Sequence, residues 1–254
     1  MTVLSDLTAA LTAGSIEVLD LTAPLSAQTP ILALPEPLGQ TWPFALEEIS
    51  RYDERGPAWY WNNISTGEHT GTHFDAPIHW VTGREGADVS QVPVGRLIAS
   101  AAVLDVSAAA AADPDFLLEI DHVRTFEAQH GPLPAGGWLL VRTGWDARSS
   151  DAAAYANEGH SPGISVECAR WLAEQAPIQG VGVETVGTDA GLAHSFEPPF
   201  PCHSFLLGAG KYGLTQLQNL ASLPPTGAVV IAGPLPIVRG SGSPCRVLAL
   251  VERA

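Results

Sequence analysis

The pattern of apolar and polar positions along the chain predicts many buried strands and few helices. Near-continuous apolar runs are typical of strands buried on both faces, and they occupy residues 97–106, 138–142, 178–183, 228–232 and 246–251. Residues 165–176 instead carry apolar side chains at helical spacing, with Ser165 as N-cap and Pro177 as a stop. The same period predicts a second helix around residues 118–126. The pattern therefore favours a sheet-rich α/β domain.

The first 50 residues predict a helix, a strand and an irregular arm. Ser5 is the expected N-cap of a helix over residues 5–13, and residues 16–21 alternate as a strand does. Residues 24–43 hold five prolines, too many for regular structure. We expect an ordered arm there, whose apolar side chains lie over a pocket or a neighbouring subunit.

Residues 58–65 form an aromatic-rich stretch that predicts a further strand. Trp59, Trp61 and Asn63 would share one face of it, because side chains alternate along an extended chain. Large aromatic residues line pockets, and they also dominate hydrophobic cores. Both interpretations of this face stay open.

Length and composition allow one large domain or two small ones. The chain has 254 residues, of which 46% are hydrophobic, and nothing in it resembles a linker, so we expect one domain over residues 1–254. Twelve basic against 27 acidic residues give a net charge of −15, with no basic cluster. This charge argues against nucleic acid and anionic membranes as partners.

The termini and the cysteines indicate a cytoplasmic protein. The N-terminus lacks the pattern of a signal peptide, and no run approaches the roughly 18 apolar residues of a membrane span. Cys168, Cys202 and Cys245 are odd in number and scattered. A disulfide framework or a zinc ribbon is therefore not expected.

The candidate chemistry is concentrated between residues 69 and 79, in the run HTGTHFDAPIH. Three histidines and one aspartate occupy odd-numbered positions in this run, namely His69, His73, Asp75 and His79. In an extended chain these four side chains would share one face, and the opposite face would be apolar from Phe74 onward. One face is expected to carry the chemistry and the other to anchor the segment.

A straight strand cannot bring these side chains to one ion. At about 3.3 Å of rise per residue, His69 and His79 would lie roughly 33 Å apart, whereas metal–nitrogen bonds measure about 2.0–2.2 Å. Gly71 can accept a turn, and Pro77 cannot continue a sheet ladder. With those bends the first two histidines and the aspartate predict a divalent metal site, since two imidazoles and one carboxylate suit zinc, manganese or iron.

The same run resembles the His-x-Gly-Thr-His-x-Asp-x-Pro-x-His signature of the metal-dependent cyclase superfamily, which includes bacterial kynurenine formamidase and isatin hydrolase. Every fixed position of the signature is present. Further similarity covers residues 18–26, 180–183 and 210–251, and residues 224–250 are typical of the branch that contains isatin hydrolase. The resemblance implies a swivelling β/β/α fold and a homodimer or homotetramer.

The resemblance also implies roles for individual residues. His69, His73 and Asp75 are the predicted metal ligands. His79 would act as general base and acid, because an imidazole titrates near the operating pH. His203 would reach the same centre, where it could orient the substrate, relay a proton or bind the ion.

The sequence lacks one acidic residue that is typical of the superfamily, and this difference bears on the number of bound ions. In the superfamily, a glutamate at a fixed distance after the histidine equivalent to His203 can bridge two ions. The same count from His203 ends at Thr215, next to Gln216, so this glutamate is missing here. A two-ion cluster needs carboxylates to offset its charge. We therefore predict one divalent ion, manganese or zinc, with an oxygen of Gln216, or of Thr215 one residue earlier, as a further ligand.

The predicted reaction is hydrolysis of an amide C–N bond. A divalent ion lowers the pKa of a bound water toward neutrality and polarises a carbonyl group. The substrate would be a small cyclic amide, such as an isatin-like lactam or imide, or an N-formyl aryl amide, and Trp61, Phe74 and Trp80 are the candidate contacts. Two alternatives remain: a metal-dependent cyclase of an aromatic polyketide-type pathway, and a metal-binding regulatory or structural protein that does not need His79.

Overall fold

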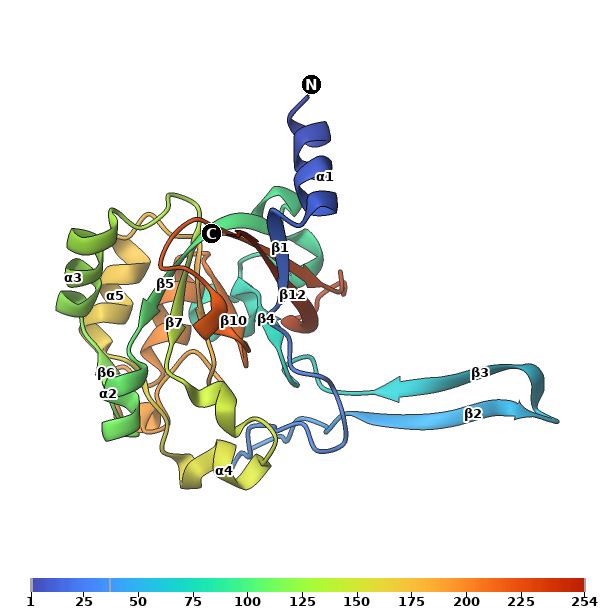
Figure 1. Ribbon diagram of the computed structural model, residues 1–254. Helices are drawn as coiled ribbons and strands as arrows, with labels where there is room; N and C mark the ends of the chain where they lie inside the picture. Colours follow the sequence, from blue (N-terminus) through green and yellow to red (C-terminus); the bar gives the residue numbers. More distant parts are fainter. Residues whose placement is uncertain (1, 37, 254) are drawn as a thin grey trace.

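The chain is built around a sheet of eight strands that closes on itself (Figure 1). The computed structural model describes residues 2–36 and 38–253. The strand order is β1-β12-β11-β5-β7-β9-β10-β4, and β4 also pairs with β12, which closes the sheet into a barrel. The strands are β1 (Ile16–Asp20), β4 (His73–Asp75), β5 (Ile98–Asp105), β7 (Trp138–Arg142), β9 (Gly180–Val183), β10 (Tyr212–Thr215), β11 (Ala228–Pro234) and β12 (Gly242–Glu252).

Four neighbouring strands of the barrel, β5, β7, β9 and β10, run parallel, and the other pairings are antiparallel. Parallel strands are buried on both faces, as the apolar runs predicted. In β7, Trp138 and Leu140 join the core inside the barrel. Leu139 and Val141 join a second core on the outer face of the sheet. The strands predicted from apolar runs are therefore confirmed.

Helices cover one side of the barrel (Figure 1). Two of them, α3 (Ile120–His130) and α5 (Val166–Glu174), pack on the outer core together with the short strand pair β6 (Leu117–Leu118) and β8 (Gly163–Ile164). The others are α1 (Val3–Ala13), α2 (Ser107–Ala112) and α4 (Ala152–Ala156). Ser165 caps α5 as predicted, since its side chain accepts a hydrogen bond from the backbone N–H of Cys168.

The start of α1 corrects one prediction. Thr2, not Ser5, is the N-cap, because the Thr2 side chain accepts a hydrogen bond from the backbone N–H of Ser5. The Ser5 hydroxyl in turn accepts from the backbone N–H of Thr2, at 2.9 Å, which completes a capping box. The serine is therefore the third residue of the helix rather than its cap. Residues 24–43 contain neither helix nor strand among those described, as their prolines predicted.

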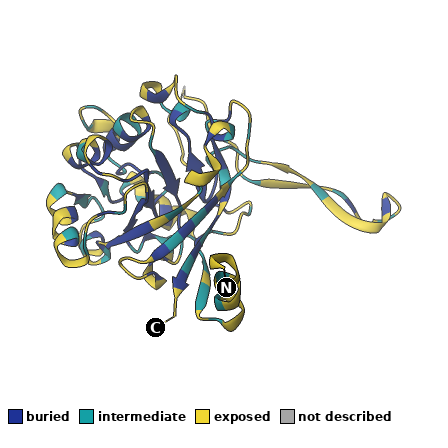
Figure 2. Cartoon of the chain, turned by 90° about the horizontal axis from the view of Figure 1, so that it is seen from above, coloured by how far each residue is buried: buried dark blue, intermediate teal, exposed yellow. Residues whose placement is uncertain are grey.

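A hairpin of β2 (Ala45–Asp53) and β3 (Gly56–Ser65) projects away from the barrel (Figure 1). Strand β3 was predicted and β2 was not. Trp59 and Trp61 are 49% and 54% exposed, so the interpretation of these aromatics as core residues is wrong. Figure 2 shows the hairpin exposed along nearly its whole length. Within the described chain no third strand lies beside the hairpin, because β2 and β3 pair only with each other.

The architecture as a whole confirms the predicted sheet-rich α/β class with few helices. The implied swivelling β/β/α architecture also agrees with it. Among the residues that the structure describes, no helix is both long and apolar enough to cross a lipid bilayer.

Candidate metal centre and active site

The run from His69 to His79 is bent twice, at the two residues that the sequence singled out. Gly71 has a φ of +69°, a left-handed conformation that glycine adopts without strain. The extended piece, β4, is only three residues long. A single 3-10 turn at Pro77–His79 follows and folds His79 back toward the strand. The predicted bends are therefore confirmed.

The opposite face of β4 anchors the segment in the core. Phe74 has no exposed surface, and its ring lies 5.1 Å from that of Tyr212 and 6.2 Å from that of Trp138. Ala76 is equally buried. The prediction that Phe74 contacts the substrate is wrong, because its side chain faces the interior of the barrel and no part of it reaches the surface.

Glycines on the two flanking strands let them approach β4 closely. A Cβ at Gly213 of β10 would lie 2.6 Å from an Asp75 carboxylate oxygen. A Cβ at Gly242 of β12 would lie 2.6 Å from the His69 ring. Contacts this short do not occur, so any side chain at either position would push the site apart. The pairing of β4 with β10 and β12, which we call the barrel seam, therefore depends on the same two glycines as the geometry of the polar site.

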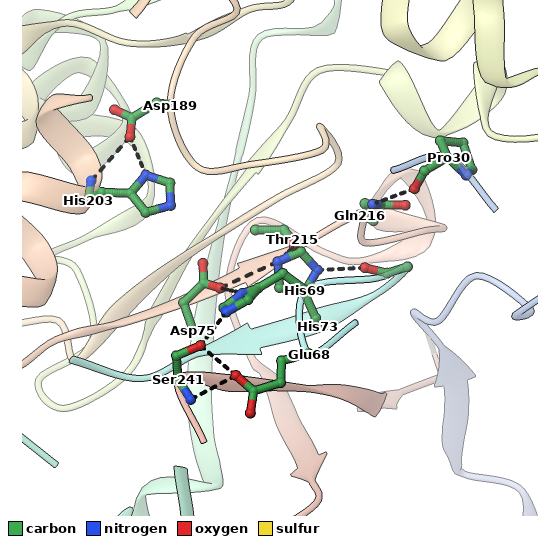
Figure 3. A network of polar contacts seen from close by, with 11 residues as sticks. Pro30, Glu68, His69, His73, Asp75, Asp189, His203, Thr215, Gln216 and Ser241 are labelled. Carbon is green, nitrogen blue, oxygen red and sulfur yellow. Dashed lines mark hydrogen bonds and ion pairs between the residues drawn. The ribbon is translucent and has the colours of Figure 1, made fainter. Parts of the chain in front are cut away.

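Asp75 is the centre of the polar cluster (Figure 3). One of its carboxylate oxygens, Oδ1, lies 2.8 Å from His69 Nδ1 and 3.4 Å from His73 Nε2. Burial alone would raise the pKa of this carboxyl, but the two imidazoles outweigh burial and hold it well below its usual value. Asp75 is therefore an ionised, buried carboxylate.

The hydrogen bonds of His69 and His73 show which ring nitrogens are available to a ligand. The Ser241 hydroxyl donates to the acceptor-only Glu68 carboxylate at 2.6 Å, so it accepts from His69 Nε2–H at 2.8 Å. His73 Nδ1–H donates to the Gly71 carbonyl at 2.7 Å. The ring nitrogens that face Asp75 are therefore His69 Nδ1 and His73 Nε2, and Thr215 Oγ1 also lies 3.0 Å from the latter.

Two ring nitrogens that face one carboxylate oxygen are ligand atoms of the kind that bind a divalent cation. Such histidines usually donate their other N–H to a carbonyl or polar group, as both do here. A bound divalent metal would use one lone pair from each of these three ligand atoms. The residues present therefore fit a divalent ion.

His79 also lies within this group. Ligand atoms of His69, Asp75 and His79 all fall within 4.8 Å of one another, and the His69 and His79 rings stack at 3.8 Å. Burial, together with the neighbouring His69 and His203, lowers the pKa of His79 to about 3, although Asp75 opposes the shift. His79 is consequently neutral at physiological pH, and its pKa does not lie near the operating pH as the sequence analysis expected.

His203 approaches from the opposite side. Its ring lies 5.4 Å from that of His79 and 4.8 Å from that of Trp80. Its Nδ1 is hydrogen-bonded to Asp189 (Figure 3). Asp189 also accepts from the backbone N–H of Cys202 at 2.7 Å. Burial opposes protonation, but Asp189 outweighs it and raises the pKa of His203.

The model of the Cyclase family matches residues 19–190. The chain is 46% identical to the isatin hydrolase of Roseibium aggregatum over 258 residues, which cover 99% of this chain and 98% of that relative. This chain belongs to the cyclase family. Among solved structures, isatin hydrolase A from Ralstonia solanacearum has a TM-score of 0.96 at 49% identity, over 99% of this chain and 98% of the other. An isatin hydrolase bound to the product analogue thioisatinate has the same TM-score, 0.96, at 46% identity, over 100% of both chains.

The similarity of this cyclase-family chain to hydrolases over its whole length bears on the predicted reaction class. It confirms the prediction of a metal-dependent hydrolase that acts on a C–N bond outside peptides. It disfavours the polyketide-type cyclase and gives no support to a regulatory protein without catalytic activity.

The remaining predicted residues of the cyclase-family site lie at different places. Thr215 Oγ1 is 2.8 Å from His73 Nδ1 and 3.0 Å from Nε2, so this hydroxyl contacts a predicted ligand directly. The Gln216 side chain donates its amide N–H to the Pro30 carbonyl at 3.2 Å, which leaves its oxygen as the only ligand atom (Figure 3). Trp61 lies on the projecting hairpin and is not brought to the other candidates within the described chain.

Sequence reasoning missed three groups of this site. Asp189 orients His203 from a loop that gave only weak signals. Glu68 and Ser241 orient His69, and Ser241 is 172 residues away from it in the chain. Glu68 precedes the signature directly, so its position could have suggested a role. Ser241, which directly precedes β12, could not have been found from local spacing, because only the closure of the barrel brings it to His69.

Proposed function

We propose that this protein hydrolyses the lactam C–N bond of isatin or a closely similar ring-fused cyclic amide. The observation that carries the proposal is the convergence of two imidazole nitrogens on Asp75, with His79 beside them. The whole-chain similarity to isatin hydrolases, one of them bound to a product analogue, supports the choice of substrate.

One divalent ion, manganese or zinc, is proposed to bind His69 Nδ1, His73 Nε2 and Asp75. The oxygen of Gln216 is proposed as a further ligand, because its amide nitrogen is already engaged by Pro30. Such an ion supplies a bound water of lowered pKa and polarises the substrate carbonyl. Either metal suits mixed nitrogen and oxygen ligands.

The protein's own residues then move the proton. His79 lies beside His69 and Asp75, and its imidazole is proposed to take a proton as the water oxygen bonds to the carbonyl carbon. The same imidazole returns the proton to the ring nitrogen as the C–N bond breaks, which yields a ring-opened amino carboxylate. His203, held by Asp189, and Trp80 lie on the side of His79 where the substrate would be oriented.

Elemental analysis followed by a substrate assay tests this function. The protein loaded with manganese or zinc should contain one ion per chain and consume isatin, with release of one acid proton at neutral pH. His79→Ala should keep the ion but lose activity by at least about 100-fold, the usual contribution of general acid–base catalysis. The exposed His194 provides a matched control, because His194→Ala should leave both ion and rate unchanged.

Turnover of other amides, compared with that of isatin, tests the proposed substrate. An N-formyl aryl amide that is turned over faster than isatin would replace the lactam as substrate. Failure with every amide tested, in a protein that contains its ion, would overturn the hydrolysis of isatin-like lactams. Full activity in His79→Ala would overturn the assignment of that residue.

We also propose that the chain forms a homodimer or homotetramer through the β2–β3 hairpin. An isolated two-stranded hairpin is marginally stable in water, yet this one exposes Trp59, Trp61 and Ile64. A second copy covering those side chains would account for both facts. Light scattering should give a multiple of the chain mass, and Trp59→Ala combined with Trp61→Ala should shift it toward the monomer. The cytoplasmic location stays a prediction.

A further inference from the structure

The segment that carries His79 packs directly against the segment that carries His203. Trp80, the residue after His79, is extended and connects two 3-10 turns. His203 begins a π-helical turn, His203–Leu207, which is a rare geometry that occurs frequently at functional sites. A Cβ at Gly83 would lie 2.7 Å from the last carbonyl oxygen of this turn, so any side chain there would push the two segments apart.

Ser204, the second residue of the π-helical turn, joins the two segments through hydrogen bonds. Trp80 Nε1–H donates to the Ser204 hydroxyl at 3.1 Å, and that hydroxyl donates to the Pro199 carbonyl at 3.1 Å. These directions are fixed, because an indole N–H only donates and a carbonyl oxygen only accepts. The Thr82 hydroxyl donates to the Ser204 carbonyl at 2.7 Å. We call the two bonds from Trp80 and Thr82 the Ser204 clamp.

The Ser204 clamp lies beside His79 and His203. The Trp80 ring is 4.8 Å from the His203 ring and 6.1 Å from the His79 ring, and the two histidine rings are 5.4 Å apart. Asp189 binds His203 at Nδ1, which orients the imidazole on its own helical turn (Figure 3). That bond does not tie the turn to the segment of His79. The Ser204 clamp supplies this second restraint.

We propose that Ser204 is a positioning residue that sets the separation of His79 and His203 by tying Trp80 to the π-helical turn. This inference rests on the proposed lactam hydrolysis, in which His79 moves the proton. Rates depend steeply on such geometry, since a misplacement of about 1 Å can cost about 100-fold. Loss of the Ser204 clamp should therefore lower kcat, whereas the proposed metal ligands lie on and before β4 and should keep their ion.

Removing the Ser204 hydroxyl tests the clamp. In the metal-loaded enzyme, Ser204→Ala should lower kcat for isatin about tenfold, with the metal content unchanged. Ser204→Thr keeps the hydroxyl and should retain at least about half of the wild-type kcat. In a Trp80→Phe background, which has no indole N–H, Ser204→Ala should lower kcat further by less than about twofold, because both changes break the same bond. If Ser204→Ala does not fold, Thr82→Val removes the other bond of the clamp and should also lower kcat.

Two hydroxyls outside the clamp provide matched controls. Ser195 donates to the Leu192 carbonyl at 2.8 Å, and Thr125 donates to the Asp121 carbonyl at 2.7 Å, both at exposed positions. Ser195→Ala and Thr125→Val should therefore keep the wild-type kcat. Wild-type kcat in both Ser204→Ala and Thr82→Val, or a further tenfold loss when Ser204→Ala is added to Trp80→Phe, would overturn the clamp and leave the proposed function standing.

The indole N–H resonance of Trp80 tests the clamp without any substrate. The resonance is assigned by its loss in Trp80→Phe, and it should shift in Ser204→Ala and return in Ser204→Thr. An unmoved resonance in Ser204→Ala would overturn the clamp even in an active enzyme. Conversely, a wild type that hydrolyses no lactam, but shows the shift in Ser204→Ala, would overturn the proposed function and support the clamp as the link between the two segments.

Discussion

Strands β3 and β4 follow each other closely in the chain, yet β3 is almost wholly exposed and all three residues of β4 are buried. By composition β3 is the better candidate for burial, since it contains Trp59, Tyr60 and Trp61. The difference lies in their partners. β4 pairs with β10 on one side and with β12 on the other, whereas β3 pairs with β2 alone. For β3 and β4, burial therefore follows the number of neighbouring strands and not the apolar character of the strand.

β4 and the hairpin also differ in how firmly their side chains are held. The place of β4 in the closed barrel holds polar side chains in one geometry, because backbone and core fix it on every side. The hairpin has no such support within the described chain, and its large aromatic side chains are free to meet another surface. A catalytic constellation requires the first arrangement, and an intersubunit contact suits the second. Variants at β4 and in the hairpin test this difference.

Removing the charge of Asp75 should have the largest effect. Asp75→Asn keeps the shape of the side chain but removes the carboxylate on which the two imidazoles converge. We expect less than about a tenth of the metal to remain and activity to fall by about 1000-fold or more, roughly 4 kcal/mol of transition-state stabilisation. Asp53→Asn on β2 is the matched change in the hairpin and should alter neither quantity. Full metal occupancy in Asp75→Asn would contradict the ligand assignment.

Adding a methyl group at the barrel seam should have the second-largest effect. In Gly213→Ala and Gly242→Ala the new Cβ meets Asp75 and His69 at 2.6 Å in each case. Overpacking of this kind costs about 1–3 kcal/mol in the free energy of unfolding, which denaturant titration measures. Gly95→Ala is the control, because nothing lies within 4 Å of a Cβ there. Seam variants as stable as the control would show that β4 is not held tightly by its neighbours.

The contrast between β3 and β4 also shows what the sequence could and could not predict. The bends at Gly71 and Pro77 were predictable, because each follows from the backbone properties of one residue. The buried parallel strands were predictable from apolar runs. The enclosure of β4 between β10 and β12 was not, since it joins segments from the two halves of the chain. For the same reason Phe74 was misplaced as a substrate contact, and Trp59 and Trp61 could not be recognised as exposed.

The site residues also differ in whether local sequence could predict them. The histidines and the aspartate of residues 69–79 lie within one short run, so local spacing was enough to predict a polar cluster there. Ligand atoms of His69, Asp75 and His79 lie within 4.8 Å of one another, and the choice of His73 as a ligand stays a prediction. Asp189 and Ser241 reach the site through loops and barrel closure, and no local pattern marks them. Residues that orient the others are therefore the ones that sequence reasoning misses.

Asp189 is expected to act as a positioning residue through His203, with an effect of about 10- to 100-fold on kcat. Asp189 holds the pKa of His203 above its usual value, so Asp189→Asn should lower it. The pH range in which His203 is protonated would then end at a lower pH, and any limb of the pH–rate profile due to His203 should move to lower pH. Metal content and KM should stay the same.

A second aspartate–histidine pair provides the control for that variant. Asp115 accepts from His160 Nδ1 at 2.8 Å, but this pair is partly exposed. Asp115→Asn should leave kcat and the pH–rate profile unchanged. An unshifted profile in Asp189→Asn, with a lower melting temperature as its only change, would mean that Asp189 only stabilises the loop.

The smallest effect is expected in the hairpin. Trp61 is 54% exposed, and no third strand lies beside its hairpin within the described chain, so Trp61→Ala should change the free energy of unfolding by less than about 0.5 kcal/mol. The measurement is denaturant unfolding at a protein concentration low enough for the chain to be monomeric. At higher concentration the wild type should gain stability from association, and Trp61→Ala should gain less. A loss above about 1 kcal/mol in the monomer would instead mean that the hairpin folds back onto its own barrel, and the contrast between the two strands would then not hold in solution.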